Sequence, residues 1–99
     1  MYAIGVNPWV WASPVDDRVL ADLIPKIAAF GFEAVELPIE QPGDWDPVRT
    51  RDLLAAHGLV AAGVCAVTPP GRDLVDAAPA VVESTVAYLR TCVDAAAAV

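Results

Sequence analysis

The chain has 99 residues, which is enough for one small domain. A hydrophobic fraction of 57% and three tryptophans argue against disorder. Thirteen acidic residues against six basic ones give a net charge of -7. This balance argues against a nucleic-acid partner and against an acidic membrane surface, because both need a basic patch that neutralises phosphates.

The two cysteines, Cys65 and Cys92, form no CxxC motif and no dense framework, so neither a metal clip nor a disulfide scaffold is expected. Free thiols are typical of a reducing compartment, and we predict a cytoplasmic protein. The first residues lack the charged and apolar segments of a signal peptide. No apolar run approaches the roughly 20 residues that a membrane span needs.

The first apolar run, at residues 2–6, predicts a strand. A helix follows, because apolar residues then recur at helical spacing and Asp16 or Asp17 can cap its first turn. Pro25 removes one backbone donor inside this pattern, so we expect a kink or an irregular first half. Gly31 suits the position just after the end of the helix.

The second unit repeats this order. Residues 32–38 predict a strand, and Asp46 with Pro47 gives a helix cap followed by proline at the first helical position. This second helix should end at Gly58. Residues 59–67 predict a third strand, which is apolar throughout instead of alternating.

A third helix is expected to begin near Pro79. Its apolar stripe consists of Val82, Val86, Leu89 and Val93. The order β-α-β-α-β-α predicts an α/β fold with parallel strands, right-handed crossovers and apolar strands that are covered on both faces. In such proteins the sites lie at the carboxyl ends of the strands.

Familiar catalytic motifs are few in this sequence. The glycine pattern of a dinucleotide site and the phosphate-binding P-loop are both missing from it. The one histidine, His57, falls in the last turn of the second helix, where the helix dipole favours it. These 99 residues therefore provide no Ser/His/Asp or Cys/His arrangement.

Several residues at the predicted strand ends have two interpretations. Asn7, Trp9 and Trp11 either close the end of a small core or form an aromatic wall with a polar group, which would suit a sugar. Cys65, near the end of the third strand, either faces a pocket or fills the core as a small apolar residue.

Glu36 is the least expected residue of the second strand. Strand alternation puts two sets on opposite faces: Phe32, Ala34, Glu36 and Pro38 on one, and Glu33, Val35, Leu37 and Ile39 on the other. If the second set packs under helices, Glu36 points to the inner face of the sheet near its carboxyl end. A charged carboxylate there needs hydrogen bonds, a cation or a ligand.

Three segments together resemble a known superfamily. They read IGVNPWVW, LIPKIAAFGFEAVELPIE and GLVAAGVCAV. The chain resembles the N-terminal third of the sugar phosphate isomerase/epimerase superfamily, the xylose isomerase-like TIM barrels. Within it, the sequence is most similar to the D-tagatose/D-psicose 3-epimerases.

The resemblance implies that residues 1–99 are the N-terminal portion of a (β/α)8 barrel, left incomplete here because a whole barrel needs about 250 residues. It implies one divalent metal (manganese, cobalt or magnesium) in the full-length enzyme and proton transfer next to the carbonyl of a ketose. The metal ligands and the acid/base pair belong to later strands, so no catalytic residue and no metal ligand is expected in this chain.

The resemblance also implies roles for four residues. Asn7, Trp9 and Cys65 match substrate-facing positions, although Asn7 stands where the family often has an aromatic residue. Glu36 fits an inward-facing carboxylate that supports substrate binding. We therefore expect a small sugar as the partner, with neither nucleic acid nor membrane, and the sequence leaves a homo-oligomer open.

The sequence leaves four alternatives open. The same fold serves inosose dehydratases, hydroxypyruvate isomerases and endonuclease-IV-like hydrolases, and the acidic charge speaks against the nuclease. A non-enzymatic α/β interaction module is a further alternative.

Overall fold

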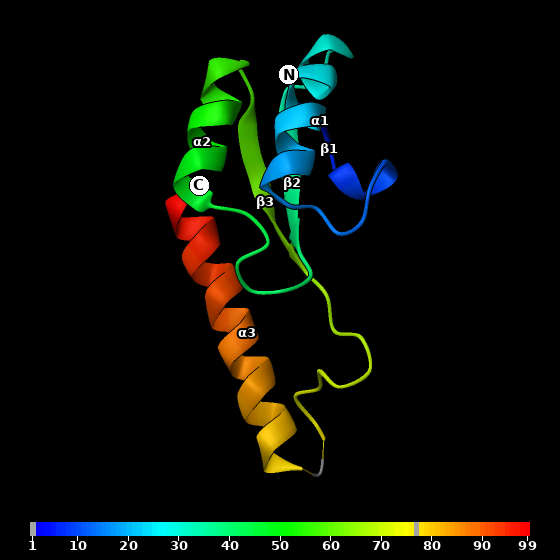
Figure 1. Ribbon diagram of the computed structural model, residues 1–99, viewed down its shortest axis with the longest axis vertical. Coiled ribbons are helices and arrows are strands. Elements are labelled where there is room, and N and C mark those ends of the chain that lie inside the picture. Colours follow the sequence, from blue (N-terminus) through cyan, green and yellow to red (C-terminus); the bar gives the residue numbers. More distant parts are fainter. Residues whose placement is uncertain (1, 77) are drawn as a thin grey trace.

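The computed structural model describes residues 2–76 and 78–99, which form three consecutive βα units (Figure 1). The strands are β1 (Gly5–Val6), β2 (Ala34–Ile39) and β3 (Val60–Ala66). The helices are α1 (Asp17–Ala29), α2 (Pro47–Ala56) and α3 (Pro79–Ala98), and a short 3-10 helix, η1 (Pro8–Val10), follows β1. The strands are parallel and lie in the order β1-β2-β3, so the predicted parallel α/β fold is confirmed.

Strand β1 is shorter than its apolar run at residues 2–6 predicts. Its ladder with β2 pairs Gly5 with Ala34 and Val6 with Val35. Ile4 adds one hydrogen bond through its carbonyl, yet its side chain is 65% exposed. The first strand therefore forms one edge of the sheet, with little packing at its start.

Helix α1 begins where the sequence predicts. Asp16 is the N-cap, because its Oδ1 accepts a hydrogen bond from the Val19 N–H at 2.8 Å. The helix stays continuous across Pro25 and ends at Ala29. Gly31 follows with φ +91°, a backbone conformation that only glycine adopts without strain.

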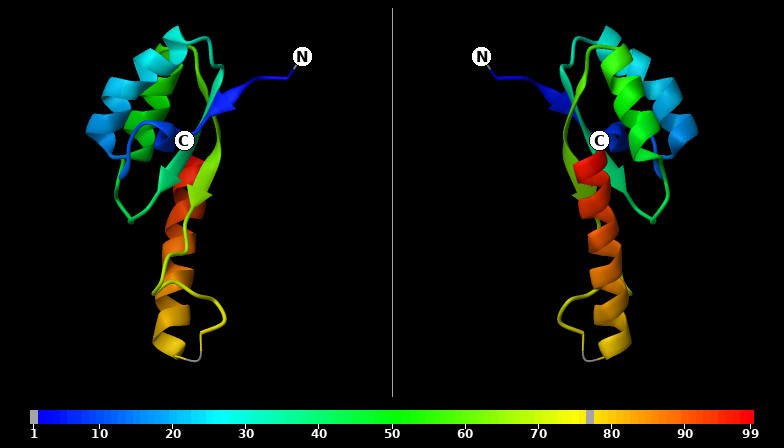
Figure 2. Two further views of the ribbon diagram at one scale, coloured as in Figure 1. Left: turned by 90° about the vertical axis from the view of Figure 1, so that its right-hand side faces the viewer. Right: turned by 90° about the vertical axis from the view of Figure 1, so that its left-hand side faces the viewer.

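Helices α1 and α2 lie together on one side of the sheet (Figure 2). The core between them and the sheet includes Leu20, Ile24 and Ile27 from α1 and Leu54 from α2. The opposite face of the sheet is left open, and Glu36 is exposed there. The expectation that the strands are covered on both faces is therefore wrong for the described residues, where Glu36, Val60 and Ala62 are exposed.

Helix α3 packs along β3 and extends beyond the carboxyl ends of the strands (Figure 2). Its buried residues are Thr85, Tyr88, Cys92 and Ala95. The predicted valine and leucine stripe does not provide this face, since Val93 is 66% exposed. The stripe lies beside the buried face, so that Leu89 packs against the edge of the core and Val82 and Val86 are only partly buried.

Among residues 2–76 and 78–99, no helix is both long enough and apolar enough to cross a bilayer.

The open sheet face and the exposed edges predict weak stability for the chain made alone. Val60 on β3 is 59% exposed, and Ile4 lies beyond the other edge. Because unpaired apolar edges associate, we expect residues 1–99 to be poorly stable or oligomeric. Sedimentation velocity combined with denaturant unfolding measures both properties. A compact monomer with a cooperative unfolding transition would contradict the prediction.

Candidate functional site

Asn7 and Glu36 form a hydrogen-bonded pair: Asn7 directly follows β1, and Glu36 lies in the middle of β2. The Oδ1 of Asn7 accepts from the Trp9 N–H at 2.9 Å and so caps η1. Because the cap uses the carbonyl side of the amide, Nδ2 is directed to Glu36 and donates to its Oε2 at 3.2 Å. The first turn after β1 thus orients the partner of the carboxylate.

Glu36 points to the open face because its neighbours are needed in the core. Val35 and Leu37 on either side of it are fully buried on the helix side. The ladder with β3 also has a register shift between Val35 and Glu36, so that Glu36 pairs with Gly63. Gly63 has no side chain, and the carboxylate therefore has space above β3.

A shallow hollow of about 250 Å³ lies around this pair, lined by Gly5, Val6, Asn7, Glu36 and Ala62. Gly5 allows close contact between the strands, because a Cβ there would lie 3.1 Å from both the Cβ and the carbonyl oxygen of Ala34. The hollow has an apolar floor and two convergent polar groups, which is the composition of a small-molecule site.

Cys65 lies further along the same face of β3 and pairs with Pro38. It is half-buried and free. Burial raises the pKa of its thiol, and the negative charge of Glu36 and the proximity of Cys92 raise it further. At neutral pH this residue is therefore a neutral thiol, a weak donor beside the hollow and not a nucleophile.

The structure separates the two tryptophans from this pair. Trp9 packs against the hydrophobic core, and its Nε1 is buried with no hydrogen-bond partner among the described residues. Trp11 stacks on Phe30 with ring centroids 6.1 Å apart. The sequence groups Asn7, Trp9, Glu36 and Cys65, whereas the hollow itself is lined by Asn7 and Glu36, with Cys65 nearby on the same face.

Two side-chain contacts connect the three loops that follow the strands. The hydroxyl of Ser13 contacts both carboxylate oxygens of Glu40 at 2.9 Å. Arg72 donates through Nη2 to the Oε1 of Gln41 at 2.9 Å. Sequence reasoning missed Ser13, Gln41 and Arg72, although polar side chains on neighbouring strand ends of a parallel sheet were the available signal.

Three side chains hold the loop after β2, and among them Asp46 forms the helix cap that the sequence predicts. Trp45 donates through Nε1 to the Pro38 carbonyl at 2.8 Å. One carboxylate oxygen of Asp44 accepts from the backbone N–H groups of Glu40 and Gln41. Asp46 caps α2 by accepting from the Arg49 N–H at 2.7 Å.

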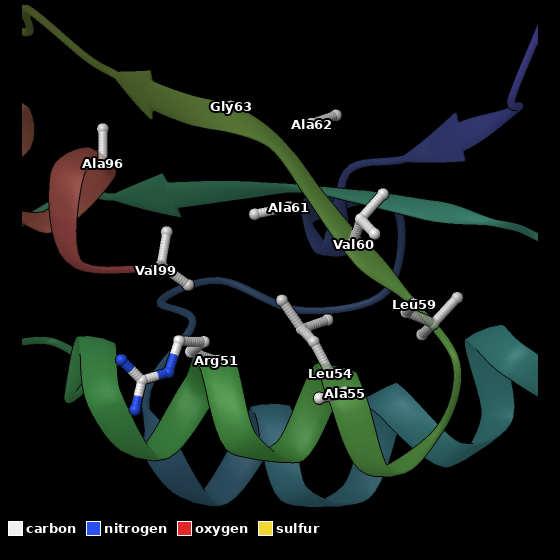
Figure 3. A pocket seen from close by; sticks show the side chains of 10 residues that line it. All are labelled: Arg51, Leu54, Ala55, Leu59, Val60, Ala61, Ala62, Gly63, Ala96 and Val99. Carbon is white, nitrogen blue, oxygen red and sulfur yellow. The ribbon is translucent and has the colours of Figure 1, made fainter.

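A larger hollow of about 460 Å³ lies between α2, β3 and the end of α3 (Figure 3). Its lining is mostly small and apolar, from Leu54 and Leu59 to Ala96 and Val99, with Arg51 as the charged member. It lies on the helix side of the sheet, away from Asn7 and Glu36. Without convergent polar groups it is a gap in packing and not the stronger candidate site.

No family model matches the sequence. A ketose 3-epimerase from Arthrobacter globiformis is 30% identical over 91 residues, which is 92% of this chain and 31% of that protein. The resemblance to ketose 3-epimerases is confirmed. The chain spans about a third of the length of this relative.

Solved structures of ketose 3-epimerases have the same fold. A D-allulose 3-epimerase from Methylomonas sp., in complex with D-allulose, matches 94% of this chain and 32% of its own, with a TM-score of 0.82 and 24% identity. An L-ribulose 3-epimerase matches 96% of this chain and 32% of its own, with a TM-score of 0.81 and 24% identity. The three βα units are therefore those of a (β/α)8 barrel.

Ketose 3-epimerases imply a divalent metal, and the residues of this chain do not fit one. Among the residues that the structure describes, no three His, Cys, Asp or Glu side chains are grouped so that they could hold a metal ion. The carboxylates of Glu36 and Glu40 are each engaged by a side chain from the first loop, Asn7 and Ser13.

The charge of Glu36 predicts the reactivity of Cys65. Glu36→Gln removes the negative charge that raises the thiol pKa, so the pKa should fall and more thiolate should be present at pH 8. We expect iodoacetamide to alkylate Cys65 faster in this variant than in the unmodified protein. Mass spectrometry at a series of pH values measures the rate. Glu33→Gln, at the exposed beginning of the same strand, is the control and should leave the rate unchanged. An unchanged pH profile in Glu36→Gln would show that the two groups do not interact.

Proposed function

We propose that the whole protein that carries this chain is a ketose 3-epimerase, which moves a proton at the carbon next to the carbonyl of a ketose. The observation that carries the proposal is the 30% identity to a ketose 3-epimerase over 92% of the chain. The hydrogen-bonded pair of Asn7 and Glu36 supports it, because Asn7 belongs to the loop after β1 and the active sites of such barrels are built on the loops that follow the strands.

The contribution of this chain is to bind and orient the sugar. The exposed carboxylate of Glu36 accepts hydrogen bonds from sugar hydroxyl groups, and the Asn7 amide keeps its direction fixed. The small, neutral side chain of Cys65 lines the β3 side of the proposed sugar site. Trp9 supports the loop from the core side and holds η1 in place.

The proton-transfer groups lie elsewhere in this proposal. Residues 1–99 contribute neither the acid/base pair nor the ligands of the manganese, cobalt or magnesium ion, which come from other parts of the whole protein. A metal ion in such an enzyme polarises the substrate oxygens. The name of the relative favours the epimerase over the inosose dehydratase, the hydroxypyruvate isomerase and the non-enzymatic module.

Glu36→Gln in the whole protein should lower ketose epimerisation while the metal content stays unchanged. A charged acceptor of sugar hydroxyl groups contributes about 1.5–3 kcal/mol, so we expect a loss in kcat/KM of about tenfold or more. The measurements are epimerisation rates by chromatography and metal analysis of the same preparations.

Glu33→Gln is the matched control, since it removes one carboxylate from the exposed beginning of the same segment. It should keep the activity of the unmodified protein. Loss of the metal ion in Glu36→Gln would make Glu36 a ligand and overturn its assignment. Full activity in Glu36→Gln would show that the charge of Glu36 does not contribute to substrate binding.

The 99-residue chain made alone should neither bind a catalytic metal tightly nor convert a ketose. The reason is the spacing of its acidic side chains, which do not converge in groups of three among the described residues. Calorimetric titration with Mn²⁺, and incubation with D-allulose or D-fructose, test the two statements. Tight binding of one ion per chain, or turnover of either ketose, would contradict them.

A further inference from the structure

The hydroxyl of Tyr88 lies where the ladder between β2 and β3 ends. Ile39 pairs with Ala66, so the next N–H that the register brings towards the Ile39 carbonyl is that of Val67. The Tyr88 hydroxyl accepts from this N–H at 2.9 Å and donates to the Ile39 carbonyl. One side chain from α3 thus binds both groups of the next ladder position.

The tyrosine is well placed to keep both contacts. It is 3% exposed, and burial raises the pKa of its hydroxyl. The group therefore retains its proton and can donate to a carbonyl. A phenylalanine would fill the same space in the core, so the hydroxyl is needed for the strand ends and not for packing.

Arg72 holds the loop after β3 against the same tyrosine. Its guanidinium lies 3.8 Å from the centre of the Tyr88 ring. It donates through Nη1 to the Val67 carbonyl at 3.2 Å and through Nη2 to Gln41 on the neighbouring loop. One residue further along, the Asp73 N–H donates to the hydroxyl of Thr85 at 2.9 Å.

We propose that Tyr88 and Arg72 are positioning residues that set the separation of β2 and β3 at their carboxyl ends and thereby the place of Cys65 in the sugar site. The inference rests on the proposed function for its consequence in catalysis. Cys65 is two residues before Val67, and Glu40 directly follows Ile39. Both residues are thus carried by the backbone that Tyr88 joins.

The test compares Tyr88→Phe with a matched hydroxyl deletion on the same helix. Thr91→Val is the control, because the Thr91 hydroxyl donates to the Ala87 carbonyl of its own helix. In the whole protein, each variant is assayed for alkylation of Cys65 by iodoacetamide, with the modified peptide quantified by mass spectrometry. Each is also assayed for KM and kcat with a ketose.

We expect Tyr88→Phe to raise the Cys65 alkylation rate by about fivefold, and KM by about tenfold with kcat changed less than about threefold. Thr91→Val should leave all three within about twofold of the unmodified protein. If Tyr88→Phe does not fold, Arg72→Met provides the same measurements with the tyrosine in place, and its shifts should have the same direction.

The proposal is overturned if Tyr88→Phe changes neither the alkylation rate nor KM, or if Thr91→Val changes both to the same extent. A fall in kcat alone would also overturn it, because displacement of Cys65 should weaken substrate binding and therefore raise KM. If the whole protein converts no ketose, the proposed function fails, while the alkylation rates still decide whether Tyr88 positions Cys65.

Discussion

The central strand β2 has one face buried under helices and the other open, and the candidate site depends on this difference. Burying an aliphatic side chain such as Val35 or Leu37 stabilises the fold by about 1.5–3 kcal/mol, whereas burying an unpaired carboxylate costs several kcal/mol. A slip of one residue would exchange these two sets of side chains. The packing under α1 and α2 therefore fixes Glu36 on the open face.

The parallel arrangement then collects the polar groups. All three strands end at the same edge of the sheet, so the loops that begin at Asn7, Glu40 and Val67 become neighbours although they are far apart in sequence. Ser13 reaches the second loop, and Arg72 reaches back to it from the third. This continuous line of contacts makes the rim of the site one connected structure and not three independent loops.

The sequence predicts the parts of this fold that depend on local chemistry. The caps at Asp16 and Asp46 and the turn glycine Gly31 follow from preferences that act within a few residues. The buried face of α3 was missed, because apolar residues at helical spacing do not say which of two adjacent flanks a neighbour covers. Tyr88 could not be paired with Ile39 either, since 49 residues separate them and only the tertiary fold brings them together.

In the proposed epimerase, the same geometry would separate sugar binding from proton transfer. Inverting one carbon requires that a proton leaves from one side and returns from the other, so an acid/base pair has to flank the substrate. Asn7 directly follows β1, Glu36 lies on the neighbouring strand β2, and the two side chains are hydrogen-bonded to each other at one face of the sheet. They can contact a sugar from one side only. In the proposed epimerase such a wall would orient the substrate, and groups outside residues 1–99 would serve the second side of the reacting carbon.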